Sequence, residues 1–312
     1  MSTLHHHLLR ILLTVFFVLA AASSLHAENR IGVIMTGDIS FYREIHEKFV
    51  AEINKRYTGT EKIEIILQKP FPNPISWSNA ARKLIAFDVD LIMTYGSPAT
   101  QAVIQEKTKI PLVYAGLYEP DHAAVSVKNT TGCGFKIPLS SILRYFKRFK
   151  TLNTIGIVFS STEEDSVRQY ETMQLLCSQQ KIRSEKIDIR SHDDLERLKA
   201  INADAFFITG SSLVHLWLDE VMTILDEKYV PVADIFPDNL EFGVLMTLHQ
   251  PTASQGEMAA ELVSQILRGK KPVEVPAHVF RDTELVLNLV EANHLGITIP
   301  IQLLIEATRV IE

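Results

Sequence analysis

The chain has 312 residues, a formal net charge of −6 at pH 7, 46% hydrophobic residues and two cysteines. This mildly acidic composition without basic runs argues against nucleic acid or an anionic membrane as a partner. Two cysteines cannot form a disulfide framework, and we expect Cys133 and Cys177 to be free thiols rather than one bridge. The length suits one large or two medium domains.

The first 27 residues have the pattern of a secretory signal peptide. Arg10 contributes to a positively charged N-terminal region, and Ile11–Ala22 forms an apolar region. Leu25-His26-Ala27 then resembles a cleavage signal of the A-x-A type. The apolar run is shorter than the roughly 20 residues that span a bilayer, which favours cleavage after Ala27 over an uncleaved anchor. Because no cysteine stands near that site, we predict a free periplasmic protein rather than a lipoprotein.

From Arg30 onward, short apolar runs alternate with amphipathic segments, and this plan occurs twice. In the first half, strands are predicted at Ile31–Met35, Ile63–Gln68, Leu91–Tyr95 and Leu112–Leu117, and helices at Phe41–Tyr57, Trp77–Phe87 and from Ser97. In the second half, strands are predicted at Ile155–Phe159, Ser184–Ile189, Ala205–Thr209, Val230–Ala233 and Val244–Leu248, and helices at Ser166–Gln179, Asp193–Ile201, Leu213–Tyr229 and Ser254–Arg268. This alternation predicts an α/β protein with two lobes, parallel sheets and helices on both sheet faces, the chain first crossing between lobes at Gly132–Pro138.

The segment Leu91–Pro120, LIMTYGSPATQAVIQEKTKIPLVYAGLYEP, contains the first candidate binding loop. An apolar strand runs into Ser97-Pro98, where an amphipathic helix begins. Ser is a favourable N-cap and Pro fits the first helical position, so we expect Ser97 to cap this helix. The helix N-terminus, with free amides and a partial positive charge, suits an anionic ligand group at the strand ends.

Other loops at predicted strand ends are rich in hydroxyl, acidic and aromatic side chains. Hydroxyls and amides can hold a carboxylate, acids can hold an ammonium group, and rings can cover an apolar body, so the set fits a zwitterion with an apolar body. Plain helix capping is the alternative role for the Ser and Asp residues, and Asp165 is a candidate N-cap of its own helix. The candidates are Phe41, Tyr118 and Phe236 for the apolar body, Glu119, Asp165 and Asp234 for the ammonium group, and Ser166, Ser211 and Ser212 for hydroxyl contacts.

Signatures of catalysis are missing from the sequence. It contains no G-x-S-x-G, H-E-x-x-H, G-x-x-x-x-G-K-[ST] or G-x-G-x-x-G pattern, and the histidines after the signal peptide are scattered singly. We therefore predict no catalytic residue, no metal site and no cofactor.

Three blocks of sequence resemble the ABC-transporter substrate-binding family that includes the tryptophan- and tyrosine-binding proteins. They are TYGSPATQAVIQEKTKIPLVYAGLYEP, TIGIVFSSTEEDSVRQYE and the closing block ELVLNLVEANHLGITIPIQLL. The resemblance implies a type I periplasmic-binding-protein fold, in which two Rossmann-like lobes with parallel sheets surround a central cleft. On this basis we expect residues 28–135 plus 250–275 in the N-terminal lobe and residues 136–249 plus 276–312 in the C-terminal lobe.

The resemblance also implies that a small ligand is gripped between hinged lobes and delivered to the membrane permease of an ABC transporter. The family's ligands lean towards aromatic and apolar amino acids. Ser97, Pro98 and Ala99 align with the binding loop of the first lobe, and Asp165 and Ser166 align with that of the second lobe, where the family has Asn-Ser. The extra charge of Asp165 either repels a carboxylate or recruits an amine. We expect the protein to be a monomer. The alternative to a component of an importer is a ligand-sensing module that passes its signal to a membrane receptor or kinase. A third hypothesis is an exported enzyme.

Overall fold

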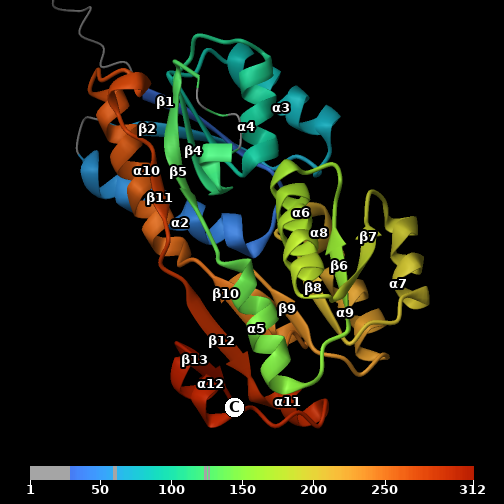
Figure 1. Cartoon of the computed structure of the whole chain (residues 1–312). Helices are drawn as coiled ribbons and strands as arrows, with labels where there is room; N and C mark the ends of the chain where they lie inside the picture. Colours follow the sequence, from blue (N-terminus) through green and yellow to red (C-terminus); the bar gives the residue numbers. More distant parts are fainter. Residues whose placement is uncertain (1–28, 59–61, 123–124, 126) are drawn as a thin grey trace, which may run out of the picture.

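The computed structural model describes residues 29–58, 62–122, 125 and 127–312 and shows two α/β lobes, each built on its own sheet (Figure 1). This confirms the predicted two-lobed α/β architecture. The predicted signal peptide lies outside the described residues. Among the described residues, no helix is both long enough and apolar enough to cross a membrane.

The first lobe contains a six-stranded parallel sheet with the order β11-β5-β4-β3-β1-β2. Helices α2 and α10 cover one face and α3 and α4 the other, because each helix buries one apolar side against the sheet. The elements are β1 (Asn29–Met35), α2 (Ser40–Arg56), β2 (Ile63–Gln68), α3 (Pro74–Ala86), β3 (Leu91–Tyr95), α4 (Ser97–Gln105), β4 (Leu112–Tyr118), β5 (Thr130–Phe135), α10 (Thr252–Leu267) and β11 (His278–Phe280).

The second lobe contains a seven-stranded sheet with the order β13-β12-β10-β9-β8-β6-β7. Helices α5 and α6 lie on one face, and α7, α8 and α9 on the other. The elements are α5 (Leu139–Phe149), β6 (Thr154–Phe159), α6 (Glu164–Gln179), β7 (Arg183–Asp188), α7 (Glu196–Ala200), β8 (Ala205–Ile208), α8 (Ser212–Leu216), α9 (Leu218–Asp226), β9 (Val232–Asp234), β10 (Met246–His249), β12 (Glu284–Asn288), α11 (Leu289–His294), α12 (Ile301–Glu306) and β13 (Arg309–Ile311). One pair departs from the predicted parallel arrangement: β12 returns directly from the first lobe and runs antiparallel to β10.

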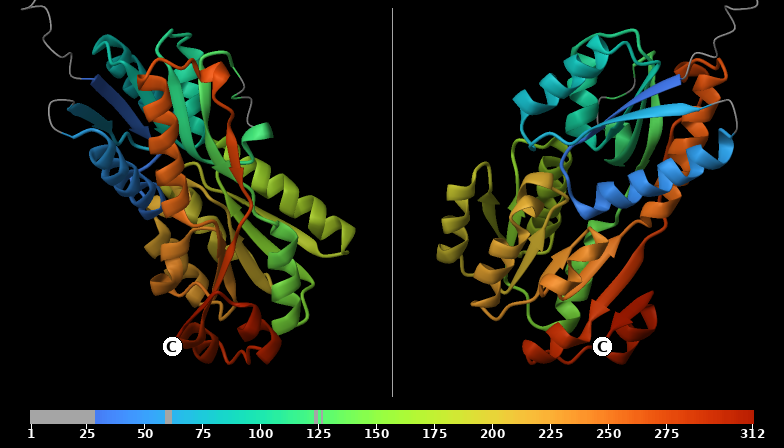
Figure 2. Two further views of the ribbon diagram at one scale, coloured as in Figure 1. Left: turned by 90° about the vertical axis from the view of Figure 1, so that its left-hand side faces the viewer. Right: turned by 180° about the vertical axis from the view of Figure 1, so that it is seen from behind.

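Strand pairing shows where the chain passes between the lobes. Residues 130–135 form β5 of the first sheet, so the first crossing is confined to the residues between β5 and α5. The last return to the second lobe follows Phe280, because β11 still pairs with β5. The chain therefore passes between the lobes after β5, after β10 and after β11, and Figure 2 shows α11 and α12 at the far end of the second lobe.

One predicted helix is interrupted. The segment expected to form a single helix at 213–229 forms α8 and α9, separated at Trp217, whose φ of −117° and ψ of 28° are not helical. The break leaves α8 short, and Ser212 at its N-terminus lies against Gly37 of the first lobe.

The apolar core continues from one lobe into the other. Its largest cluster includes α2 and α10 of the first lobe and α5 and α6 of the second, and residues such as Phe41 and Phe236 connect the two parts. Cys133 and Cys177 are both buried and unpaired, in agreement with the expected free thiols.

Candidate functional site

Loops that follow the carboxyl ends of the strands in the two sheets meet between the lobes. Ser97 donates its amide to Asp165 Oδ2 across the lobes at 3.1 Å. Arg168 of the second lobe donates to the Tyr118 carbonyl of the first at 2.9 Å. Loops from both lobes therefore contact one another directly.

The entrance to α4 is built differently from the prediction. Gly96, not Ser97, is the N-cap, and its φ is 84°, a conformation that favours glycine. A Cβ at Gly96 would lie 2.4 Å from the Tyr42 hydroxyl, so a side chain has no room there. Ser97 is the first helical residue and Pro98 the second, which leaves the Ser97 amide free to bind Asp165. The next amide, of Ala99, donates to Thr36 Oγ1 at 3.3 Å.

Asp165 lies in the first turn of α6 and is 4% exposed. Burial raises the pKa of its carboxyl to about 6, while the charge of Arg168 and the Ser97 amide act in the opposite direction. Arg168 is its ion-pair partner within the same helix. The alternative that Asp165 caps its own helix is wrong, because the N-cap position of α6 is Glu163.

Glu163 is a buried site residue that the sequence analysis missed. Its carboxylate accepts hydrogen bonds from the Ser211 hydroxyl (2.6 Å) and from the amides of Ser212 and Leu213 (2.8 Å each). Burial raises the pKa of Glu163, and these three donors oppose that rise. In the sequence, Glu163 is part of a Glu-Glu-Asp run, which is typical of an exposed helix start. No local signal therefore shows that Glu163 is buried.

His215 and Asp234 form a buried pair next to this loop. His215 Nε2 lies 2.9 Å from Asp234 Oδ2, and Nδ1 lies 2.6 Å from the Ser211 carbonyl. Burial lowers the pKa of His215, but Asp234 and the Ser211 carbonyl outweigh it and raise the pKa above its ordinary value. Both ring nitrogens face oxygen acceptors, so this surrounding favours the protonated imidazole, which can donate to both. Asp234 also accepts the amides of Ile235 and Phe236, and so fixes the loop after β9.

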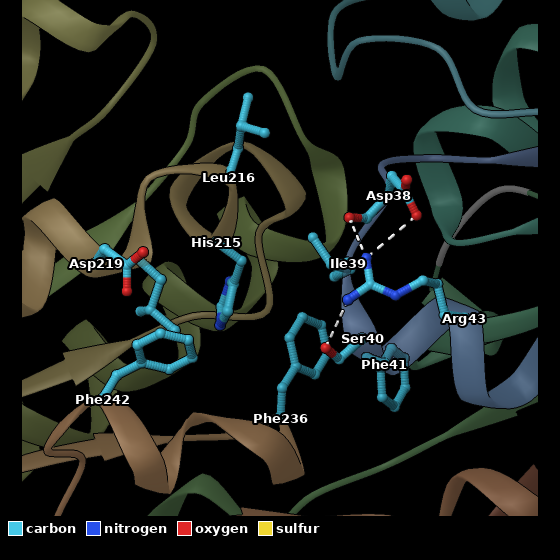
Figure 3. Close-up of a pocket in the computed structure, with 11 residues that line it drawn as sticks. Asp38, Ile39, Ser40, Phe41, Arg43, His215, Leu216, Asp219, Phe236 and Phe242 are labelled. Atoms are coloured by element: carbon cyan, nitrogen blue, oxygen red, sulfur yellow. Dashed lines mark hydrogen bonds and ion pairs between the residues drawn. The ribbon is translucent and has the colours of Figure 1, made fainter.

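Aromatic side chains from both lobes meet beside these polar groups. Phe41 of α2 stacks on Phe236 of the second lobe with ring centroids 4.3 Å apart. A pocket of about 190 Å³ lies next to this stack. Figure 3 shows the residues of both lobes that line it. Its lining includes the charged or titratable side chains Asp38, Arg43, His215 and Asp219 and the rings of Phe41, Phe236 and Phe242.

Three other predicted residues lie at the strand ends, and each has side-chain contacts within its own lobe. The Glu119 carboxylate is 2.9 Å from Lys136 Nζ. The Ser166 hydroxyl is 2.7 Å from Thr209 Oγ1 and also accepts the Ser160 amide, so it is held inside the second lobe. The Tyr118 ring packs edge-on against Phe135, with centroids 5.8 Å apart.

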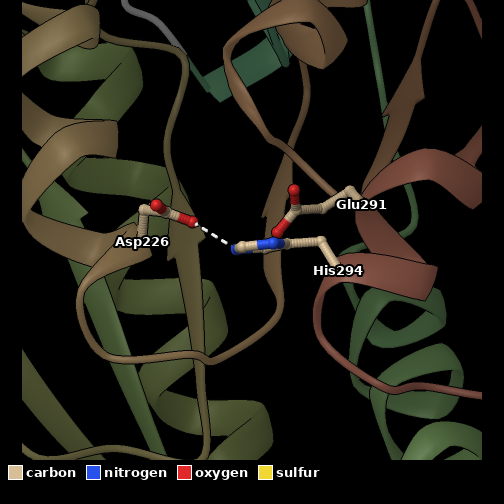
Figure 4. Close-up of side chains that lie close together, drawn as sticks. All are labelled: Asp226, Glu291 and His294. Atoms are coloured by element: carbon tan, nitrogen blue, oxygen red, sulfur yellow. Dashed lines mark hydrogen bonds and ion pairs between the residues drawn. The ribbon is translucent and has the colours of Figure 1, made fainter.

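A separate group of metal-ligating side chains lies away from the cleft, at the end of the second lobe. Asp226 of α9 and Glu291 and His294 of α11 bring their ligand atoms within 4.8 Å of one another (Figure 4). His294 Nε2 is 2.9 Å from Asp226 Oδ1, and both residues are exposed. This ion pair connects α9 to α11, and that structural role accounts for the arrangement.

Comparisons with known proteins agree with this geometry. The sequence profile of the family described as ABC transporter substrate binding protein matches residues 57–311. The tyrosine-binding protein of Clostridioides difficile (strain R20291) is 21% identical over 248 residues, covering 75% of this chain and 71% of that protein.

Solved structures share the fold. A Streptococcus pneumoniae ABC domain in complex with L-Trp is 22% identical with a TM-score of 0.85, covering 91% of this chain and 100% of that chain. The ligand-free, open structure of a Clostridium difficile substrate binding protein with adhesive properties is 19% identical with a TM-score of 0.64, covering 91% and 99%. Because the family profile matches most of its length, the chain belongs to the ABC transporter substrate-binding protein family, whose members are solute-binding proteins and not enzymes.

Proposed function

We propose that the chain is the exported, periplasmic solute-binding component of an ABC importer and that it works as a monomer. It holds an amino-acid-like ligand with an aromatic or apolar body between its lobes, and a membrane permease recognises the closed form. Family membership supports the transport role. The tyrosine-binding relative and the neighbour in complex with L-Trp support an aromatic ligand.

The observation that carries the proposal is the meeting of aromatic rings from both lobes at the cleft. Phe41 and Phe236 stack directly, with an angle of 15° between their planes, and Tyr42 lies against both rings. A flat apolar ligand at this point gains contacts from both lobes at once. Its binding therefore favours the closed arrangement over the open one.

The arrangement of the lobes adds support. The C. difficile structure and the S. pneumoniae structure are about equally distant from this chain in sequence, at 19% and 22% identity. The TM-score is nevertheless 0.85 against the complex with L-Trp and 0.64 against the ligand-free, open structure. We infer that the structure described above is a closed state.

Ligand class is tested by a thermal-shift screen against amino acids, small sugars and carboxylates. A compound that binds only the native state raises the melting midpoint. We expect a shift with an aromatic or apolar compound, and we expect Phe236→Ala to weaken its binding by about 2 kcal/mol because one ring wall is lost. Phe87→Ala, which removes an exposed ring outside the cleft, is the matched control and should leave affinity unchanged. Shifts confined to sugars would contradict an amino-acid-like ligand.

The importer role is tested by uptake of the labelled ligand in cells that lack this chain. Uptake should fall without the chain, recover with the wild type, and recover only in part with Phe236→Ala. Uptake that is independent of the chain would contradict the role in import.

A further inference from the structure

The acidic segment 163–165 of the second lobe binds the N-termini of two helices at the cleft with its carboxylates. One of these helices belongs to each lobe. Asp165 accepts the Ser97 amide at the start of α4 at 3.1 Å. Glu163 accepts the amides of Ser212 and Leu213 at the start of α8 at 2.8 Å. Free amides and the helix dipole make such positions favourable for a ligand carboxylate. Here the chain's own carboxylates already occupy them.

The cations around the cleft are also paired within the chain. Among the acids, the carboxylate of Asp219 has no hydrogen-bond or ion-pair partner in the described part of the chain. Asp219 lines the pocket in Figure 3. The pocket thus offers a ligand the unpaired carboxylate of Asp219, whereas the positive groups around the cleft each have an acidic partner. Arg168 Nε is buried without an acceptor, but the charge of its guanidinium is paired with that of Asp165. The existing pairs are Arg168 with Asp165, Arg43 and Lys69 with Asp38, and His215 with Asp234.

We propose that the ligand is a cationic amine with an aromatic or apolar body and no carboxylate, and that Asp165 sets this preference. The inference rests on the proposed function and narrows its ligand class. An amine is attracted by the unpaired carboxylate of Asp219. It also needs no anion-binding position, so Asp165 can stay on the Ser97 amide.

An amino acid would meet two penalties in the same cleft. Its carboxylate would have to displace Asp165 from the Ser97 amide. Asp165 would then remain close by, because it is fixed in the first turn of α6 and paired with Arg168. Two carboxylates in one buried site repel each other, and the displaced one loses its amide partner in a position shielded from water.

The preference is tested by isothermal titration calorimetry at pH 7 with tyramine, L-tyrosine and L-tyrosinamide, and with tryptamine against L-tryptophan. Tyramine lacks the carboxylate, and L-tyrosinamide keeps the size of that group without its negative charge. We expect tyramine and L-tyrosinamide to bind at least about tenfold tighter than L-tyrosine. Tighter binding of the amino acids would overturn this inference and leave the proposed function standing. Binding of none of the five compounds would overturn this inference, whereas the proposed function would fall only if the wider thermal-shift screen gave no shift with any amino-acid-like compound.

The role of Asp165 is tested by Asp165→Asn, which keeps the shape and an oxygen acceptor for the Ser97 amide but removes the charge. We expect the ratio of tyramine affinity to L-tyrosine affinity to fall by at least about tenfold. Glu171→Gln removes an exposed acid from the same helix and should leave the ratio unchanged. The melting midpoints of both variants without ligand show whether each is folded. An unchanged ratio in folded Asp165→Asn would overturn the assignment.

Discussion

Gly96 shapes the wall of the cleft in the first lobe. Its φ is 84°, and an added Cβ would meet the Tyr42 hydroxyl at 2.4 Å and Thr36 Oγ1 at 2.6 Å. Gly96→Ala should lower the free energy of unfolding by about 2–4 kcal/mol, from backbone strain together with overpacking. Urea denaturation measures this loss.

Gly269→Ala is the matched control for Gly96→Ala. Gly269 has a similar φ of 97°, but nothing lies within 4 Å of an added Cβ. Its substitution should cost only the backbone strain, about 1–2 kcal/mol. Equal losses in the two variants would show that the contacts with Tyr42 and Thr36 do not constrain Gly96.

The chemistry of the candidate site was only partly predictable from residue types. Ser97-Pro98 correctly marked the start of α4, but propensity favours Ser over Gly as the cap. The glycine is required by the positive φ at position 96 and by the closeness of Tyr42 and Thr36, which are features of the folded chain. Glu163 was missed because its partners, Ser211 to Leu213, lie about 50 residues away in sequence. Burial of such an acid follows from tertiary packing, which a local pattern does not contain.

At the scale of the element, the N-terminus of α8 depends on Glu163. The carboxylate takes up two backbone amides and the Ser211 hydroxyl in a buried place. Glu163→Gln leaves one acceptor oxygen and turns an NH₂ group toward these donors, so we expect the free energy of unfolding to fall by about 2–3 kcal/mol.

Glu164→Gln provides the comparison for Glu163→Gln. Glu164 is exposed, and its contacts with Ser97 and Arg168 are long, at 3.4 Å and 3.8 Å. Its substitution should change the stability by less than about 0.5 kcal/mol. If chemical denaturation gave the two variants the same stability, Glu163 would not be the anchor of α8.

Strands buried on both faces were predictable, because both faces need apolar side chains. β1, β3, β4 and β6 lie within two residues of their predicted ranges. β5 was not predicted as a strand because TTGCGF has no apolar run. An added Cβ at Gly132 or Gly134 would lie 2.3 Å or 2.5 Å from a carbonyl of β4, so the close approach of β4 leaves no room for side chains there.

At the scale of the whole molecule, the closed arrangement can be tested by joining the lobes covalently. A Cβ at Gly37 of the first lobe would lie 2.6 Å from Ser212 Cβ of the second. A disulfide needs about 3.5–4.5 Å between Cβ atoms, so opening the cleft by about 1 Å at this point accommodates one. Gly37→Cys together with Ser212→Cys should therefore form a disulfide under mild oxidation, while the native Cys133 and Cys177 stay buried and unreacted.

The oxidised double variant should exclude ligands. Because the Phe41–Phe236 stack and the Ser97–Asp165 hydrogen bond join the lobes across the cleft, we expect a ligand to enter between them only when the lobes separate. A compound that raises the melting midpoint of the wild type should have no effect on the oxidised form and should regain its effect after reduction. The single variant Gly37→Cys controls for the substitution itself. If the oxidised form bound that compound as well as the reduced form does, the ligand would enter by a route that does not require opening of the cleft.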